Sequence, residues 1–230
     1  NRNLITEKEQ TLYRNSLVGI TGLSVGSSAF ATLVITGGPR HMKIADPDVL
    51  EISNLNRVRA SLPDIGQNKA EIAARQAWEV DPFLNLDIWP QGVNRTTLER
   101  FIASPRLDVF IDEMDAIPLK ILSRILCKKH RVPVLMATDN GDSIIVDIER
   151  FDLEPKRPIF HGRVRITDTE LENIDRKQFI QLANKIIDPE YFTLRQQKSI
   201  LAIGKEIDGV PRIGTAAAIS GAAIAFVVRQ

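Results

Sequence analysis

A glycine- and serine-rich stretch, TGLSVGSSAF (residues 21–30), follows an apolar run and has the residue types of a phosphate-binding loop. Gly22, Ser24 and Ser27 fall at the three positions of the pattern G-x-G-x-x-G, whose turn points backbone N–H groups at a phosphate. A serine tolerates this turn if its φ stays negative, and its hydroxyl can add a hydrogen bond. The loop alone is a weak signal, because a serine-capped strand-to-helix turn explains it equally well.

An acid at the end of the next apolar run strengthens the nucleotide interpretation. Asp46 closes HMKIAD and lies 24 residues after Gly22, where a carboxylate can accept hydrogen bonds from ribose hydroxyls. NAD, FAD and ATP share this ribose–phosphate portion, so Asp46 leaves all three ligands open.

Two cations after this acid favour a triphosphate. In DPDVLEISNLNRVRASLPDIGQNKAE (residues 46–71), Arg57 offers a planar fork of donors and Lys69 a compact charge. Lys69 falls in the first turn of an expected helix, so its ammonium and the helix dipole would act on the same anion. A dinucleotide site needs no such pair. The alternative for each cation alone is a solvated surface side chain.

The elements that would position these residues alternate between apolar strands and amphipathic helices. This alternation predicts a doubly wound, Rossmann-like α/β fold with a mainly parallel sheet and helices on both faces. Thr6 and Glu9 form a capping box, which predicts a short helix before the sheet. We expect strands over residues 16–21, 41–46, 85–89, 107–113, 132–137 and 142–151, and helices over 27–35, 68–81, 95–103 and 117–130.

The pattern changes after Phe151. An irregular or extended connection is expected first, then helices over about 176–187 and 189–204, and an apolar C-terminal helix within 213–228. We therefore expect a nucleotide-binding core over 1–151, and a crossover segment with C-terminal helices over 152–230 that packs on the core. The chain could also be a fragment of a longer protein.

Composition restricts the classes of function. The 230 residues include 30 Lys and Arg and 29 Asp and Glu, so the net charge of +1 makes no case for nucleic acid or an acidic membrane. One cysteine, Cys127, excludes a disulfide framework and a cysteine-rich zinc site. The apolar run 213–228 is shorter than the roughly 20 residues of a membrane span. These features favour a cytoplasmic protein.

The motif D-x-D-x-x-x-x-S-N-L-N-R, which begins at Asp46, and the G-x-x-K that ends at Lys69 together resemble the ThiF/MoeB/E1 superfamily. These are ATP-dependent enzymes that adenylate the C-terminal carboxylate of ubiquitin-like and sulfur-carrier proteins. The resemblance runs from Arg2 to about Asp147 and resumes in PRIGTAAAISGAAIAFVV (211–228). GLSVGSS and VPVLMATDNGD are most similar to the bacterial branch that is sometimes fused to a nitroreductase-like domain.

The resemblance implies ATP and Mg²⁺ as cofactors, no zinc, and a homodimer in which an N-terminal arginine reaches the partner's triphosphate. The substrate would be a protein or peptide C-terminus, or a small carboxylate. Asp115 would hold Mg²⁺, in preference to its neighbours Asp112 and Glu113. The implied catalytic residues are Arg2, Arg57, Lys69 and Asp115, and the implied cofactor-binding residues are Gly22, Ser24, Ser27, Asp46, Asp48, Asn54, Arg57 and Lys69.

Adenylation joins an ionised carboxylate to the α-phosphorus of ATP, so it needs positioning and cations rather than a general base. The three histidines, His41, His130 and His161, are isolated in the sequence and are interpreted as structural or surface residues. Relatives that form a thioester use a cysteine in the crossover segment. Cys127 instead lies in an expected helix at a buried spacing, so this chain should stop at the acyl-adenylate.

Several departures from the family pattern leave a second hypothesis open. Two loop glycines are serines, Ala116 replaces the usual asparagine, and Lys120 replaces a frequent arginine. A nucleotide-binding scaffold or regulatory domain without adenylation is therefore the alternative, and an NAD-dependent oxidoreductase is a third. Asp139 and Asp142 in TDNGD (138–142) could contact a ligand, although the same residues form a good turn between strands.

Overall fold

A six-stranded sheet forms the centre of the computed structural model, which describes residues 3–172, 176–187, 189–207 and 211–230. The strand order is β3-β2-β1-β4-β5-β6. All neighbours are parallel except β5 and β6, which form an antiparallel hairpin. The strands are β1 (Leu17–Thr21), β2 (His41–Ala45), β3 (Asn85–Trp89), β4 (Val109–Asp112), β5 (Val134–Asn140) and β6 (Ser143–Glu149). The predicted doubly wound fold is confirmed.

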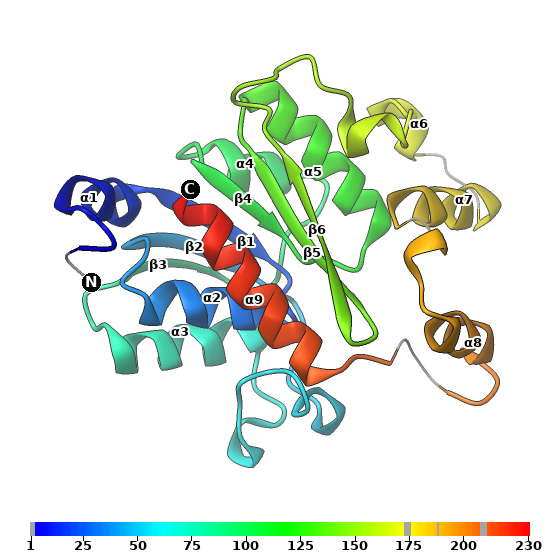
Figure 1. Cartoon of the computed structure of the whole chain (residues 1–230), viewed down its shortest axis with the longest axis horizontal. Coiled ribbons are helices and arrows are strands. Elements are labelled where there is room, and N and C mark those ends of the chain that lie inside the picture. Colours follow the sequence, from blue (N-terminus) through cyan, green and yellow to red (C-terminus); the bar gives the residue numbers. More distant parts are fainter. Residues whose placement is uncertain (1–2, 173–175, 188, 208–210) are drawn as a thin grey trace.

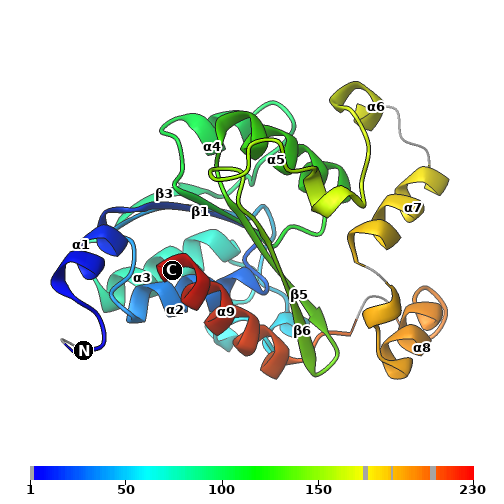
Figure 2. The ribbon, with the colours of Figure 1, turned by 45° about the horizontal axis from the view of Figure 1, so that its top comes forward.

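Helices cover both faces of the sheet (Figures 1 and 2). One face carries α2 (Gly26–Ile35), α3 (Lys69–Val80) and α9 (Gly214–Arg229), and the other carries α4 (Leu98–Ala103) and α5 (Ile117–His130). Local sequence explains their ends. Asn68 caps α3 by accepting the N–H groups of Ala70 and Glu71. The predicted capping box of Thr6 and Glu9 begins α1 (Glu7–Asn15).

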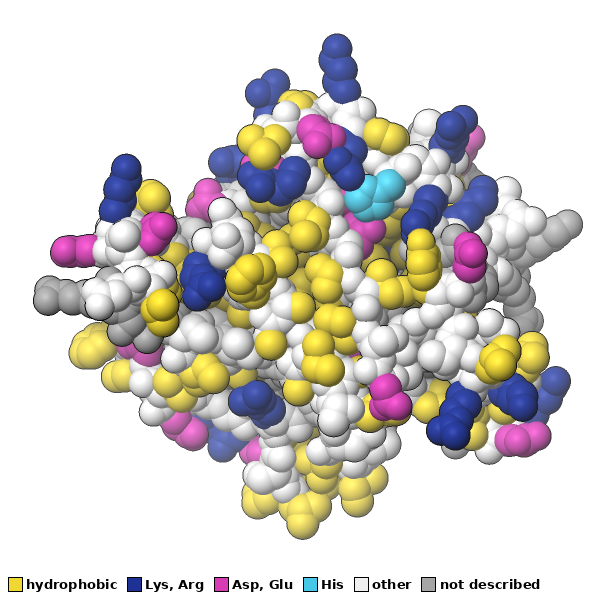
Figure 3. All heavy atoms as spheres, viewed as in Figure 1, with side chains coloured by type: hydrophobic (Ala, Val, Ile, Leu, Met, Phe, Trp, Pro, Cys, Tyr) yellow, Lys and Arg dark blue, Asp and Glu magenta, His cyan; other side chains and the backbone are white. Residues whose placement is uncertain are grey.

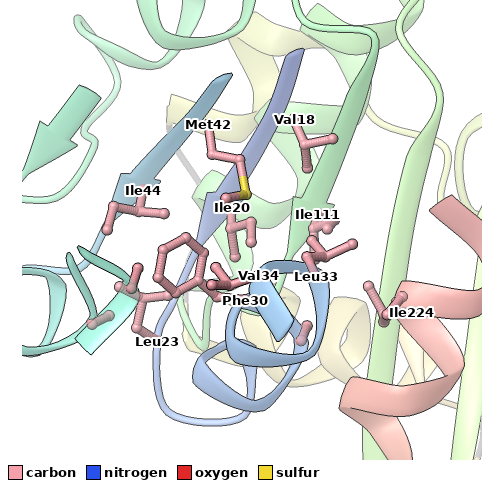
Figure 4. Close-up of a cluster of buried hydrophobic side chains, with 14 of the residues drawn as sticks. Val18, Ile20, Leu23, Phe30, Leu33, Val34, Met42, Ile44, Ile111 and Ile224 are labelled. Atoms are coloured by element: carbon pink, nitrogen blue, oxygen red, sulfur yellow. The ribbon is translucent and has the colours of Figure 1, made fainter. Parts of the chain in front are cut away.

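The core follows the alternation of side chains along the strands. On β1, β2 and β4, Val18, Ile20, Met42, Ile44 and Ile111 point toward α2 and pack with its apolar side. Figure 4 shows this cluster, with Phe30, Leu33 and Val34 arriving from α2 and Ile224 from α9. The sheet and α2 therefore hold the loop between them in a fixed position.

The segment after β6 agrees with the prediction in part. The expected connection contains a four-residue 3₁₀ turn at 159–162 and the short helix α6 (Asp168–Glu172), and the helix expected over about 176–187 is confirmed as α7 (Arg176–Ile186). A three-residue 3₁₀ turn at 189–191 and the helix α8 (Leu194–Ala202) follow. The single helix expected over 189–204 was wrong. Thr193 caps α8 by accepting the N–H of Gln196, so the chain starts a new helix there.

The apolar C-terminal helix α9 packs against α2 and β5. Gly221 permits a close crossing, because a β-carbon there would lie 2.5 Å from the carbonyl carbon of Ser28. This packing buries one side of α9. It leaves Ile219 50% exposed and Phe226 56% exposed. No helix in the described part of the chain is long and apolar enough to cross a membrane.

Candidate functional site

The loop between β1 and α2 is held in place from both sides. Gly22 has φ +85°, and its N–H donates to the carbonyl oxygen of Ala45 at 2.9 Å. The N–H of Leu23 donates to the Asp46 carboxylate at 2.5 Å. A β-carbon on Gly22 would lie 2.6 Å from the carbonyl carbon of Glu113, so only glycine fits between β1, β2 and β4 here.

The two serines that replace glycines already have partners within the protein. The Ser24 hydroxyl oxygen accepts a hydrogen bond from Nε of Arg57 at 2.9 Å. The Ser27 hydroxyl donates to the carbonyl oxygen of Ser24 at 2.8 Å and lies in the first turn of α2. Ser27 lines a separate groove of about 530 Å³ between α2 and α3. Of the two hydroxyls, Ser24 is therefore the one that links the loop to a candidate cation.

Asp46 organises the backbone at the ends of β1 and β2. One carboxylate oxygen accepts from Leu23, and the other accepts from the N–H of Asp48 at 2.8 Å. The side chain is buried, and burial raises the pKa of Asp46 above its ordinary value. A ribose would have to share these oxygens with the backbone, which a carboxylate's four acceptor sites allow.

Asp48 and Lys69 form an ion pair beside Asp46. Nζ of Lys69 lies 3.0 Å from Oδ2 of Asp48, and the backbone N–H of Lys69 donates to the Asp48 carbonyl at 3.0 Å. The Lys69 side chain is only 8% exposed, whereas that of Asp48 is 67% exposed. Lys69 opens α3, as expected, so its charge and the amino end of the helix lie together.

Arg57 lies where the loop and the SNLNR segment meet. Besides Ser24, its guanidinium donates through Nη1 to the carbonyl oxygen of Ser53 and to Oδ1 of Asn56, both at 3.0 Å. Burial, followed by the charge of Arg212, lowers the pKa of Arg57. Asn54 lies behind this segment, buried, with Oδ1 accepting the N–H of Glu51 at 3.3 Å.

Arg212 is a site residue that sequence reasoning missed. Its Nη2 lies 2.7 Å from both carboxylate oxygens of Asp115, which comes 97 residues earlier. Its carbonyl oxygen accepts from Nδ2 of Asn56 at 2.9 Å. The only signal in the sequence was an arginine directly before an apolar helix, which is also an ordinary boundary.

A cavity of about 230 Å³ opens beside Asp115 at the carboxyl ends of β4 and β5, under α8. Its charged lining residues are Glu113, Asp115, Lys120, Asp139 and Arg212. Burial raises the pKa of Glu113 to about 8 and lowers the pKa of Lys120 to about 8, and each charge partly offsets the shift of the other. The remaining lining residues, mostly apolar, are Val25, Met114, Ile117, Ala137, Thr138, Ile187, Phe192, Gln196, Ile200 and Pro211.

Asp112 belongs to a buried charge network instead of the cavity. It contacts Arg124, with Nζ of Lys120 3.3 Å from its Oδ1. Nε of Arg124 lies 3.2 Å from Oε2 of Glu149. Asp112, Arg124 and Glu149 are all completely buried, so these side chains support the sheet and α5 rather than bind a ligand.

The TDNGD segment forms the hairpin turn between β5 and β6, which confirms the turn interpretation. Asn140 pairs with Ser143, and Gly141 has φ +66°. Asp139 nevertheless reaches the cavity, where its Oδ1 accepts from the Ser220 hydroxyl at 3.0 Å. Its other oxygen, Oδ2, is buried and has no hydrogen-bond partner within the described part of the chain.

The cysteine and the histidines lie away from this edge. Cys127 is completely buried in α5, and burial raises the pKa of its thiol far above the ordinary range. His130 contacts Glu99 at 2.7 Å, His161 contacts Asp147 at 2.8 Å, and Nδ1 of His41 lies 3.2 Å from Asn85. Each histidine therefore contacts a nearby side chain and lies apart from the candidate site.

Asp115, the expected magnesium ligand, has an accessible carboxylate. Its side chain is 77% exposed at the carboxyl edge, where its carboxylate could be one oxygen ligand. Over residues 3–172, 176–187, 189–207 and 211–230, no three His, Cys, Asp or Glu side chains cluster as a metal site. This donor set suits a magnesium that arrives with phosphate oxygens and water. Arg2, the expected cross-dimer residue, lies outside the described residues.

A glycine turn, two cations and a carboxylate at the carboxyl ends of β1, β2 and β4 define a doubly wound protein with a nucleotide-type edge site. The chain belongs to the ThiF family, whose profile matches residues 1–226. The protein MT1398 of Mycobacterium tuberculosis (strain CDC 1551 / Oshkosh), described as uncharacterized, is 37% identical over 231 residues. The match covers all of this chain and 32% of that protein.

Two solved structures share the fold. E. coli tRNA N6-threonylcarbamoyladenosine dehydratase, TcdA, in complex with AMP, has a TM-score of 0.68 at 16% identity, covering 99% of this chain and 90% of that one. E. coli MccB with AMPCPP and MccA has a TM-score of 0.65 at 17% identity, covering 96% and 57%. At these identities the likeness establishes the architecture, and the expected link to a nitroreductase-like domain stays a prediction.

Proposed function

We propose that this chain catalyses the ATP- and Mg²⁺-dependent adenylation of a carboxylate, giving an acyl-adenylate and pyrophosphate. The observation that supports this most is the convergence of Arg57, Lys69, Arg212 and Asp115 on the edge formed by the Gly22 loop. ThiF-family membership and the fold shared with TcdA bound to AMP and MccB bound to AMPCPP support the same assignment.

In the reaction, one oxygen of the substrate carboxylate forms a bond to the α-phosphorus of ATP, and the bond to the β-phosphate oxygen breaks. Pyrophosphate leaves with that electron pair, and no proton needs to move. Lys69 and Arg57 hold the phosphates, because their charges offset the negative charge that builds on the phosphoryl oxygens. The backbone around Gly22 gives the phosphates close access to N–H groups, and Asp46 and Asp48 orient the ribose side of the site.

Magnesium, when bound, would neutralise phosphate oxygens and polarise the reacting phosphorus. Asp115 is the residue of this chain that would hold it. Asn54 and Ser24 support the site from behind, since Asn54 shapes the SNLNR segment and Ser24 fixes Nε of Arg57. Ser27, in the first turn of α2, stays among the residues that we propose for binding the nucleotide.

The substrate that we propose is a protein or peptide C-terminus, of the ubiquitin-like or sulfur-carrier type, or a small carboxylate. The structure of MccB together with MccA supports a polypeptide partner for this architecture. A thioester step in this chain is not part of the proposal, because Cys127 is buried with a raised thiol pKa. The near-neutral net charge and the buried thiol suit a cytoplasmic protein that works without nucleic acid or membrane.

We further propose a homodimer in which Arg2 completes the partner's site. Hydrophobic side chains gather over the middle of the face on which α9 and β6 lie (Figure 3). The helix α9 itself exposes Ile219 and Phe226. Subunits carrying Arg2→Ala and subunits carrying Lys69→Ala should each be inactive alone. Mixing them should restore one working site per dimer, and mixtures that stay inactive would exclude the cross-dimer arrangement.

The experiment that tests the proposed function is calorimetric titration of the purified chain with ATP, with and without Mg²⁺, with NAD as the control ligand. We expect micromolar binding of ATP that depends on Mg²⁺, and none of NAD. Pyrophosphate–ATP exchange in the presence of candidate peptides then tests the chemical step. Equal affinity for NAD and ATP would exclude the adenylation site.

A nucleotide-binding scaffold without adenylation is the second candidate. It is favoured because residues of the proposed site already bind one another. Arg57 donates to the Ser24 hydroxyl, and Arg212 pairs with the Asp115 carboxylate. Strong ATP binding without pyrophosphate exchange for any C-terminal peptide would favour this function. Exchange with one peptide would exclude it.

A further inference from the structure

We propose that Arg212 binds the carboxylate of the acyl substrate, and that Asp115 holds Arg212 in reserve until the metal-bound nucleotide arrives. This inference rests on the proposed adenylation and adds a substrate-binding residue and an order of binding. Its starting point is the ion pair in which one guanidinium nitrogen of Arg212 meets both oxygens of Asp115 at 2.7 Å.

In this ion pair the Asp115 carboxylate occupies the place that a substrate carboxylate would take. Arg212 is 20% exposed and lines the cavity, whereas Asp115 is 77% exposed. An ion pair this accessible contributes little stability, so exchanging one carboxylate partner for another costs little. If Asp115 held Mg²⁺, its carboxylate would no longer pair with Arg212, and Arg212 would be free to bind a second carboxylate.

The backbone of Arg212 stays fixed during such an exchange. Its carbonyl oxygen accepts from Nδ2 of Asn56, and Oδ1 of Asn56 accepts from Nη1 of Arg57. Gly214, the first residue of α9, lies so close to the Asn56 carbonyl that a β-carbon would clash there. Only the side chain of Arg212 has to move, and it remains next to the residue that we place on the phosphates.

The electrostatics of adenylation require a cation in this position. The attacking carboxylate and the α-phosphate are both anions, so they repel each other as they approach, and a nearby cation lowers that repulsion. Lys69 lies on the Asp48 side of the loop, at the beginning of α3. Arg212 lies in the wall of the cavity beside Asp115, where we place the second substrate.

The cavity also supports a peptide as the owner of that carboxylate. Its volume of about 230 Å³ and its lining by Ile117, Ile187, Phe192 and Ile200 suit one or two small apolar residues. Oδ2 of Asp139, buried without a partner in the described part of the chain, could accept the last peptide N–H. Leaving a buried acceptor unpaired is unfavourable, so this contact favours a peptide over a simple fatty or aromatic acid.

The test uses the full chain and a library of N-acetylated hexapeptides with three randomised C-terminal positions, made once as free acids and once as carboxamides. Immobilised protein captures peptides with and without Mg²⁺ and AMPCPP, and mass spectrometry counts them. We expect free acids to be enriched about tenfold over carboxamides, and only when Mg²⁺ and AMPCPP are present. Calorimetry on the same preparations measures AMPCPP binding separately.

Variants assign the effect to Arg212. Arg212→Gln should abolish the preference for free acids while AMPCPP affinity changes less than about threefold, and Arg212→Lys should keep part of it. Arg195→Gln, an exposed arginine of α8, is the matched control and should behave as the wild type. Asp115→Asn should capture free acids without nucleotide, because an uncharged amide competes for Arg212 much less than a carboxylate does.

Three outcomes would overturn the proposal. They are full capture of free acids by Arg212→Gln, equal capture by the wild type with and without nucleotide, and no enrichment of any free acid although AMPCPP binds. Failure of AMPCPP itself to bind would instead remove the proposed function, and this inference with it. For Asp139, replacing the last amide by an ester should weaken capture about three- to tenfold in the wild type but not in Asp139→Ala.

Discussion

Gly22 lies directly against the backbone of Glu113: a β-carbon at position 22 would come 2.6 Å from the Glu113 carbonyl carbon and 2.9 Å from the N–H nitrogen of Met114. This contact joins the end of β1 to the end of β4. It is the reason that the first glycine of the loop is retained while the serines at 24 and 27 are tolerated. Neither serine has a positive φ.

Gly22→Ala should therefore lose more stability than the left-handed backbone alone explains. Gly66 has the same φ of +85° but no atom near its missing β-carbon, so Gly66→Ala measures the backbone strain alone, about 1–2 kcal/mol. We expect Gly22→Ala to cost at least about 1 kcal/mol more from the clash. Urea unfolding of both variants measures the difference, and equal losses would contradict the close contact.

Lys69→Ala should weaken ATP binding about tenfold or more while leaving the fold intact, because it removes a charge proposed to lie on the triphosphate. Its partner Asp48 is largely exposed, so losing the ion pair should cost less than about 1 kcal/mol of stability. Lys129→Ala is the matched control. Lys129 lies in the last turn of α5, where it pairs with Glu99 away from the proposed nucleotide site. Calorimetry showing unchanged affinity in Lys69→Ala would remove the triphosphate assignment.

Arg124→Gln should destabilise the protein by about 3–5 kcal/mol, because Asp112 and Glu149 would remain buried without their shared cation. Arg75→Gln provides the comparison. Arg75 pairs with Asp64 at 2.5 Å, but its side chain is half exposed, so the loss should stay below about 1 kcal/mol. Thermal and urea unfolding measure both, and similar losses would contradict the structural role of the buried network.

Glu113→Gln should change how stability depends on pH. Burial raises the pKa of Glu113 from 4.5 to about 8. A carboxyl with a raised pKa stabilises the folded state below its unfolded pKa, and this contribution is lost as the pH rises toward about 8.

The wild type should therefore lose free energy of unfolding between about pH 5 and 8 more steeply than Glu113→Gln does. The difference in free energy of unfolding between the two proteins should stop changing above about pH 8. Glutamine keeps the acceptor for the Ala137 N–H, which lies 2.8 Å from Oε1 of Glu113, so the substitution removes the charge and its effect on Lys120 but not this hydrogen bond. Parallel pH profiles of the two proteins would show that Glu113 ionises normally.

Local patterns predicted most of the architecture. The strands at 17–21 and 41–45 were readable because parallel strands buried on both faces form continuous apolar runs. The capping box at Thr6 was predicted correctly because capping depends on neighbours within three residues, whereas the cap at Asn68 was included in the expected helix 68–81 and was identified only in the structure. The prediction of a single helix over 189–204 was wrong. The cap at Thr193, which begins a new helix, was overlooked within an otherwise helical composition.

The sequence by itself determined the order of the strands and helices, the position of the glycine turn, and the identities of the residues proposed for the phosphates. These features depend on side chains close together in the chain. Only the tertiary structure decided that Arg212 meets Asp115, that Ser24 holds Arg57, and that Asp112 is committed to Arg124. The first of these pairs spans 97 residues, and it exists because α9 packs on α2 at Gly221 and carries the preceding arginine to the carboxyl edge of the sheet. Hydrophobic periodicity reports which face of a helix is buried, but it does not report which distant face covers it.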